Sequence, residues 1–194
     1  MEKHTGEAEI VEEAKAGNRI SMEQIVNLFH KEIFRMVYYR IHSQMDAEDL
    51  TQKIFMQMFK SLSGLKDTGR FRPWLFRIAL NHIRDFHRKK AVFAFFRPTI
   101  EFDDYVHTSG ENNKNPVDKL VQKEFWEQFY QFTDSLSRWE REVFMLRFVD
   151  HLGIREIAEA LKKSESTVKT HLYRALKKFK HNSELHNLLK GGVS

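Results

Sequence analysis

Apolar residues in the first half of the chain recur at intervals of three and four, the repeat of an α-helix that buries one face. They form three runs: Ile25, Leu28, Phe29, Ile33, Met36 and Val37, then Leu50, Ile54, Met58 and Leu62, then Trp74, Leu75, Ile78, Ala79 and Ile83. Interruptions fall at residues 43–46 and 64–73, where glycine and proline favour loops. Only three prolines and eight glycines occur in 194 residues, so most of the chain is expected to be helical. The pattern predicts an all-α fold whose first block packs three or four helices.

A change of composition after the basic residues 88–90 separates this block from a second one. Residues 91–118 begin with an apolar run and continue with acids, asparagines, glycine and proline, a composition that favours turns over a buried core. Helical spacing then resumes near Val117. The length of the chain suits two small domains. We therefore expect a first domain at residues 1–90, a flexible acidic linker at 91–118 and a second domain at 119–194.

The second block ends with two helices whose lengths are typical of a helix-turn-helix. Ser137 and Glu140 match a capping box, which begins the helix before the motif. A short helix at 154–161 and a helix at 165–180 capped by Ser164 follow, separated by a turn of two lysines. In this motif the second helix lies in the major groove of DNA.

The second helix of the motif and its turn are strongly basic. Residues 162–181 carry seven lysines and arginines against the single acid Glu165, a formal charge of +6. Cations at this density bind phosphate, and outward-facing Lys, Arg, Ser and Thr side chains can also read base edges. An ordinary solvated helical hairpin would show the same spacing and charge, so this pattern alone leaves both interpretations open.

The composition of the whole chain limits its chemistry and its compartment. The net charge of +5 favours a polyanionic partner, although a basic protein without such a partner stays open. Without cysteine there is no disulfide, thiolate metal site or thiol nucleophile, which suits a reducing cytosol. The N-terminal segment lacks the apolar core of a signal peptide, and no apolar run is long enough to cross a bilayer. We expect a cytoplasmic protein without membrane insertion.

About fifty residues of the second block carry a family pattern. It consists of Leu136-Ser137, Arg141-Glu142-Val143-Phe144, Leu146-Arg147, Glu156-Ile157-Ala158, Ser164, Thr167-Val168-Lys169-Thr170, Leu172 and Arg174-Ala175. This segment resembles region 4 of the extracytoplasmic-function class, or group IV, of bacterial RNA polymerase sigma factors. Response regulators of the two-component type carry a similar motif. The segment departs from the pattern at Lys162 and Lys163, which replace a glycine and an aliphatic residue, and a left-handed Lys162 would cost roughly 1 kcal/mol.

The first block carries a second family pattern, in the expected order. It consists of Asp46-Ala47-Glu48-Asp49-Leu50-Thr51-Gln52, Phe55, Phe71, Trp74-Leu75, Arg77-Ile78-Ala79, Asn81, Asp85 and Arg88. This segment resembles sigma region 2. A region 3 domain is absent between the two segments, which distinguishes the extracytoplasmic-function class.

The resemblance implies a sigma factor that binds core RNA polymerase and directs promoter recognition, DNA opening and transcription initiation for a stress or envelope regulon. Polymerase supplies the catalysis, so the chain is not expected to be an enzyme or to need a cofactor. Its implied partners are the clamp coiled coil of the largest polymerase subunit, the polymerase flap, promoter DNA and an anti-sigma factor.

The resemblance also implies three sets of site residues. Polymerase binding is expected at Asp49, Gln52, Lys53 and Met56, on one face of a helix. Minus-ten DNA is expected to meet Arg77, Asn81, Arg84, Asp85, Arg88 and Lys89, with the loop at 64–72 wrapped around an extruded base. Minus-thirty-five DNA is expected to meet Ser166, Thr167, Lys169, Thr170, Tyr173, Arg174 and Lys177.

Several of these residues have a plainer interpretation. Asp49 would interact favourably with the helix dipole because it lies near a helix N-terminus, and Asp85 would form an ion pair with Arg84 or Arg88. Trp74 and Phe71 could stack on bases or belong to the core. His82, Asp85 and His87 are not spaced to bring three ligands to one metal, so no metal site is expected.

The linker has two open interpretations as well. By resemblance, Glu101, Asp103 and Asp104 would thread the polymerase channel, where their charge imitates nucleic acid, but an acidic linker can also be merely solvated. Phe93, Phe95 and Phe96 would contact an anti-sigma factor or pack on the first domain.

Two other classes of function compete with a sigma factor. A regulator that binds duplex DNA without polymerase would use the helix-turn-helix but not Asp49 and Gln52. A nuclease would need clustered carboxylates or histidines for a metal or a general base, and the sequence contains no such cluster.

Overall fold

The computed structural model describes residues 2–96 and 116–182, and within them the chain is built from α-helices and two short 3-10 turns, without a strand. The predicted all-α fold is confirmed. The described residues divide into two compact units, the first holding 2–96 and 155–163 and the second 116–154 and 164–182. None of the helices in these ranges combines the length and the apolar composition needed to cross a membrane.

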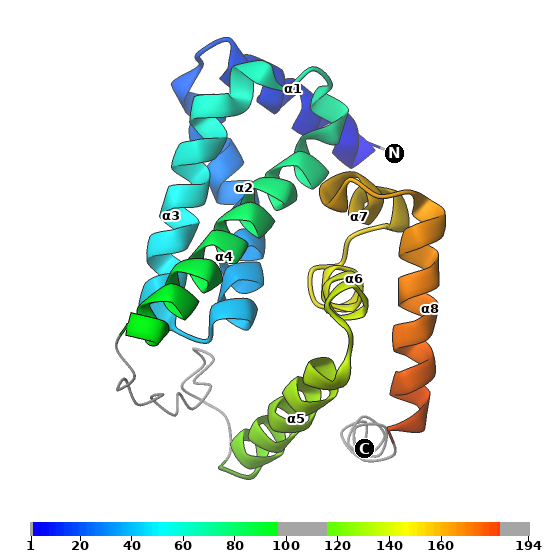
Figure 1. Ribbon diagram of the computed structural model, residues 1–194. Helices are drawn as coiled ribbons and strands as arrows, with labels where there is room; N and C mark the ends of the chain where they lie inside the picture. The colour runs from blue at the N-terminus through cyan, green and yellow to red at the C-terminus, as the bar shows by residue number, and fades with distance from the viewer. Residues whose placement is uncertain (1, 97–115, 183–194) are drawn as a thin grey trace. The chain divides into compact units, whose positions relative to one another are not determined.

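Three long helices form the body of the first unit: α2 (Arg19–Ile41), α3 (Gln44–Ser61) and α4 (Phe71–Phe96). Figure 1 shows them side by side, and each contacts the other two. The Asn18 side chain accepts the backbone N–H groups of Ile20 and Ser21, which caps the start of α2. Ser43 caps α3 in the same way by accepting the N–H of Asp46 at 3.3 Å.

The core of the first unit confirms the predicted stripe on α3, where Leu50, Ile54, Met58 and Leu62 are all buried. On α4 the prediction is partly wrong, because Trp74 and Ile78 are only half-buried while Phe76 and Leu80 are fully buried. The buried face of α4 runs through Phe71, Leu75, Phe76, Ala79, Leu80 and Ile83. Helices α2 and α3 both pack on α4, and two partners bury a wider face than one stripe provides.

Three features of the first unit were not predicted. Helix α1 (Glu2–Lys15) packs on α2 and on the 3-10 turn η2 (Thr68–Arg70), and Val11 and Ala14 are buried. On α2, Leu28 was placed in the buried stripe but is 49% exposed. Helix α4 begins before Pro73, which is tolerated within the first turn because the N–H it lacks has no partner there.

Helix α4 also continues beyond the predicted domain boundary at residue 90 and reaches Phe96. The acidic residues of the expected linker, Glu101, Asp103 and Asp104, lie outside the described residues, and so do the side chains of Phe93, Phe95 and Phe96.

The second unit has an aromatic core held between α5 (Pro116–Ser135), α6 (Arg138–Phe148) and α8 (Glu165–His181). Phe132 packs edge-on against Phe144 at 5.3 Å between ring centroids and against Phe179 at 5.4 Å. The predicted capping box is present, since the Glu140 carboxylate accepts the Ser137 N–H at 3.0 Å. Helix α7 (Ile154–Leu161) is grouped from residue 155 with the first unit.

Candidate nucleic-acid and partner interfaces

Helix α3 presents a polar face opposite its buried stripe. All four residues predicted to bind polymerase, Asp49, Gln52, Lys53 and Met56, are exposed there, and Met56 is 52% exposed although it is apolar. The buried residues recur at 50, 54 and 58, which leaves the predicted residues on the opposite face. The exposure of these four side chains leaves them accessible to a partner.

A groove of about 260 Å³ runs beside this face, between α2 and α3. It is lined by Val26, His30, Glu48, Gln52, Phe55, Met56 and Phe59. Two of the predicted residues, Gln52 and Met56, line the groove, and Asp49 and Lys53 do not. The contribution of α2 to this groove was not predicted: His30 of α2 stacks on Phe55 with 6.2 Å between ring centroids. The helical spacing within α3 could not reveal it, because the pairing of α2 with α3 is a tertiary contact.

The outer face of α4 carries the residues predicted to meet minus-ten DNA. Asn81, Asp85, Arg88 and Lys89 are exposed, and Arg77 and Arg84 are half-buried. Arg88 forms an ion pair with Asp85 at 3.0 Å, which is the plainer interpretation of Asp85. Both partners are largely exposed, so the pair contributes little to stability and yields easily to another partner of Arg88. Arg84 donates to the Asn81 side-chain oxygen at 3.3 Å.

The histidines on α4 do not form a metal site with the acids around them. No cluster of three metal-ligating side chains occurs among the residues that the structure describes. Burial lowers the pKa of His82, and the positive charges of Lys89 and Lys53 act in the same direction, against the opposing effect of Asp85.

The segment between α3 and α4 consists of two 3-10 turns, η1 (Leu62–Gly64) and η2. Asp67 caps η2 by accepting the Gly69 N–H at 3.0 Å and also pairs with Arg70 at 3.2 Å. Phe71, considered for base stacking, is instead a core residue, 3% exposed and packed edge-on against Phe29. Trp74 lies against Phe71 and is half-buried.

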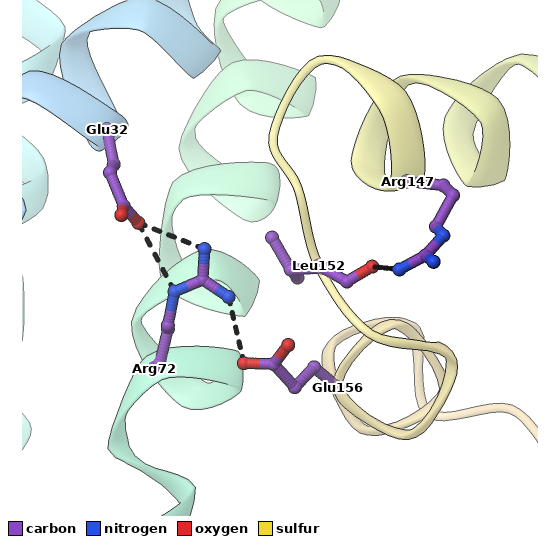
Figure 2. A network of polar contacts seen from close by, with 5 residues as sticks. All are labelled: Glu32, Arg72, Arg147, Leu152 and Glu156. Atoms are coloured by element: carbon purple, nitrogen blue, oxygen red, sulfur yellow. Dashed lines mark hydrogen bonds and ion pairs between the residues drawn. The ribbon is translucent and has the colours of Figure 1, made fainter. Parts of the chain in front are cut away.

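Arg72 is held by acids of the first unit. Its guanidinium donates to Glu32 at 3.2 Å and to Glu156 at 2.9 Å, as Figure 2 shows, and it lies 5.2 Å from the ring centre of Phe76. Burial opposes the charge, but the hydrogen bonds and charges of Glu156 and Glu32 outweigh it and raise the pKa of Arg72. These partners make Arg72 a structural residue of the unit.

The turn before α8 contains the left-handed residue that was considered at Lys162. Lys162 has a φ of 53°, so it occupies the left-handed region where glycine is usual. The Lys163 N–H donates to the Ala158 carbonyl at 2.9 Å, which closes α7 despite the missing glycine. His151, in the turn before α7, is also left-handed, and Arg147 secures that turn by donating to the Leu152 carbonyl at 3.0 Å (Figure 2).

Helix α8 displays most of the residues predicted to meet minus-thirty-five DNA. Ser166, Lys169, Thr170, Tyr173, Arg174 and Lys177 are exposed, and Tyr173 is 70% exposed. Val168 and Ala175, on the other side of the helix, are buried. The exposed set forms one continuous polar face, with cations at its centre and at its C-terminal end.

Thr167 differs from the others because it is half-buried and belongs to the N-terminal cap of α8. The Ser164 hydroxyl accepts the Thr167 N–H at 3.2 Å and shares hydrogen bonds with the hydroxyls of Thr167 and Ser166. Thr167 and Ser166 therefore both take part in the first turn of the helix, and of these two side chains Ser166 is the exposed one.

Two family models match the chain, and together they cover more than half of it. The model described as sigma-70 region 2 matches residues 25–92, and the model described as sigma-70 region 4 matches residues 126–179. The first match contains the exposed faces of α3 and α4, and the second contains the exposed face of α8.

Curated relatives include RNA polymerase sigma factors of the extracytoplasmic-function class. The chain is 29% identical to BldN of Streptomyces coelicolor over 87% of this chain and 62% of that protein, so it spans under two thirds of BldN. It is 27% identical to SigX of Bacillus subtilis over 85% of this chain and 84% of that one.

The fold is shared with solved sigma factor structures. CnrH, in complex with the cytosolic domain of CnrY, matches with a TM-score of 0.65 at 22% identity over 95% of this chain and 97% of that chain. RpoE of Bartonella quintana, in complex with the anti-sigma factor NepR, matches with a TM-score of 0.64 at 18% identity over 87% and 96%. The two family matches, in this order and with these relatives, show that the chain belongs to the extracytoplasmic-function class of RNA polymerase sigma factors, which direct promoter recognition.

Proposed function

We propose that this sigma factor divides its work among three helix faces. The α3 face binds the clamp of core RNA polymerase, the outer face of α4 captures the minus-ten element as it opens, and the α8 face reads the minus-thirty-five element as duplex. The domains that do so are residues 1–90 and 119–194, joined by the linker at 91–118. The protein works in the cytoplasm beside polymerase, which supplies all the covalent chemistry.

The observation that carries this proposal is the presence of two different kinds of exposed face in one chain. The α3 face offers a carboxylate, an amide and an exposed methionine beside an apolar groove, which suits a protein partner. The α8 face offers hydroxyls, a tyrosine and cations, which suit base edges and phosphates. A regulator that acts without polymerase would have no use for the first face.

The α3 face is tested by comparing Gln52→Ala with Gln57→Ala, since both residues are exposed on α3 but only Gln52 lines the groove. We expect Gln52→Ala to weaken binding of the full chain to core polymerase, measured by titration of a fluorescently labelled chain, and Gln57→Ala to leave it unchanged. Equal affinities for the wild type and both variants would contradict the assignment.

The α4 face is tested by Asn81→Ala, with Asn27→Ala on an exposed position of α2 as control. With saturating polymerase, we expect the Asn81 variant to bind the promoter but to open it less, because a side chain that holds unpaired bases is lost. Permanganate reactivity of unpaired thymines reports the opening. Full reactivity in the Asn81 variant would contradict the role.

The α8 face is tested by Arg174→Ala, with Lys180→Ala as a control that removes an exposed cation near the end of the same helix. A lost base contact is expected to cost about 1–3 kcal/mol at one position of the upstream element. Holoenzyme affinities for single-base variants of that element would show which position loses discrimination. Unaltered discrimination at every position would refute the contact.

An anti-sigma factor is a further proposed partner. CnrH and RpoE were both solved with protein partners, and the second partner is named as an anti-sigma factor. Affinity purification of this chain from its own host, followed by loss of transcription when the captured protein is added back to the holoenzyme, would identify such a partner. A host in which only polymerase subunits are captured would count against it.

A further inference from the structure

We propose that Glu140 is a positioning residue for the α8 face, an inference that rests on the proposed role of α8 in reading duplex DNA. Glu140 lies in the first turn of α6 and is 6% exposed, which is rare for a carboxylate. One of its oxygens, Oε2, accepts the Ser137 N–H at 3.0 Å and the Lys178 ammonium at 2.7 Å. Glu140 therefore caps its own helix and holds a side chain of another one.

The surroundings of Glu140 favour the ionised form of its carboxyl. The hydrogen bond from Lys178 lowers the pKa of Glu140, and the bonds from Ser137 add to this effect against the opposing effect of burial. A hydrogen bond between two ionised groups is shorter and stronger than a neutral one. The contact is therefore a charge-assisted link between α6 and α8.

The position of Lys178 along α8 connects the ion pair to the exposed residues of that helix. Lys178 lies one turn after Arg174 and directly after Lys177, so its attachment to α6 favours one rotation of α8 about the helix axis, in addition to the packing of the buried residues Val168 and Ala175. Phe179 packs beside it on Phe132 of α5 and Phe144 of α6, which anchors α8 against both helices. The ion pair thereby sets the direction in which Tyr173, Arg174 and Lys177 project.

The same residues surround a depression of about 720 Å³ lined by Phe132, Ser135, Glu140, Arg174, Lys177, Lys178, His181 and Asn182. Glu140 is thus a buried negative charge close to the cations of the α8 face. Simple electrostatics would make it a hindrance to DNA binding, because it attracts the cations that phosphate needs. If Glu140 only attracted these cations, its removal would strengthen DNA binding. If Glu140 positions α8, its removal is expected to weaken recognition of the upstream element.

The test uses transcription by holoenzyme from a promoter library whose upstream element is randomised, with sequencing of the transcripts. Glu140→Gln keeps an acceptor for the Ser137 N–H but removes the charge, and Lys178→Met removes the donor. Each is expected to reduce enrichment of the preferred upstream sequence roughly tenfold, and the double variant is expected to lose no more than either single variant because both break one contact. Lys178→Arg, which can still donate to the carboxylate, is expected to retain enrichment.

Lys180→Met provides the control for charge, since it removes an exposed cation from the same helix without touching Glu140. Thermal melting of each variant separates a loss of discrimination from a loss of folding. Tighter and equally selective binding by Glu140→Gln, or additive losses in the double variant, would overturn the proposal. A wild-type holoenzyme that enriches no upstream sequence would refute the proposed role of α8 and this inference with it, whereas enrichment unchanged by the variants would refute this inference alone.

Discussion

At the scale of single residues, backbone strain is concentrated in turns. His42, His151 and Lys162 have φ values of 60°, 58° and 53° although none is glycine. A side chain in this region clashes with the backbone and costs roughly 1 kcal/mol. At Lys162 this cost falls in the turn that precedes α8.

Replacement of Lys162 by glycine is therefore expected to stabilise the protein by roughly 1 kcal/mol, since glycine adopts this φ without a clash. The urea midpoint of the variant should rise. Lys163→Gly is the matched control, because Lys163 is not among the left-handed residues, so glycine there relieves no strain and adds freedom to the unfolded chain. A lower midpoint for Lys162→Gly would show that its side chain contributes more than the strain costs.

The lowered pKa of Glu140 makes its contribution to stability depend on pH. A carboxyl that ionises more readily when folded stabilises the fold above its ordinary pKa of 4.5, and this contribution is lost as pH falls through the lower folded-state pKa. Glu140→Gln should therefore melt below the wild type at neutral pH, and the gap should narrow in acid below pH 4.5. A gap that stays constant with pH would contradict the ion pair.

At the scale of helices, the sequence predicts the buried residues of a helix well when the helix buries a single stripe and its opposite face is polar. The α3 stripe through Leu50, Ile54 and Met58 follows from spacing alone, since the opposite face is polar. Helix α4 packs on two neighbours, so its wider buried face includes Phe76, which spacing did not reveal. Helix α1 is rich in glutamate and was not predicted, because its buried apolar residues, Val11 and Ala14, are too few to form a helical stripe.

The N-terminal cap of α8 is a second feature that the sequence predicts, and it can be tested. Ser164→Ala removes the acceptor of the Thr167 N–H and should destabilise the protein by about 1 kcal/mol, measured by thermal melting. Ser164→Asp keeps an acceptor and places a negative charge at the helix N-terminus, so it should melt near the wild type. Equal losses in both variants would mean that the serine acts through some contact other than the cap.

At the scale of the whole molecule, the candidate faces could be predicted more fully than their surroundings. Gln52, Asn81 and Arg174 were identified from family patterns and are exposed as expected. The groove beside α3 needs His30 from α2, and the environment of α8 needs Glu140 from α6. Neither follows from sequence spacing, because each joins residues of separate helices.

The basic character of α8 predicts a measurable dependence on salt. Each phosphate contact releases about one counterion, so Lys177→Met should reduce the slope of log affinity against log salt by about 1 for holoenzyme on promoter DNA. The loss should be similar for preferred and altered upstream sequences, since phosphate carries no sequence information. An unchanged slope would place Lys177 outside the phosphate contacts.

The central claim is that this chain gives core RNA polymerase its promoter specificity. The most direct measurement is transcription from a promoter library by core polymerase with and without the purified chain, beside binding of the same library by the chain alone. We expect discrete transcription starts that share a minus-ten and a minus-thirty-five element only when the chain and polymerase are both present. Tight, selective binding of duplex by the chain alone, with no association with polymerase and no change in its starts, would contradict it.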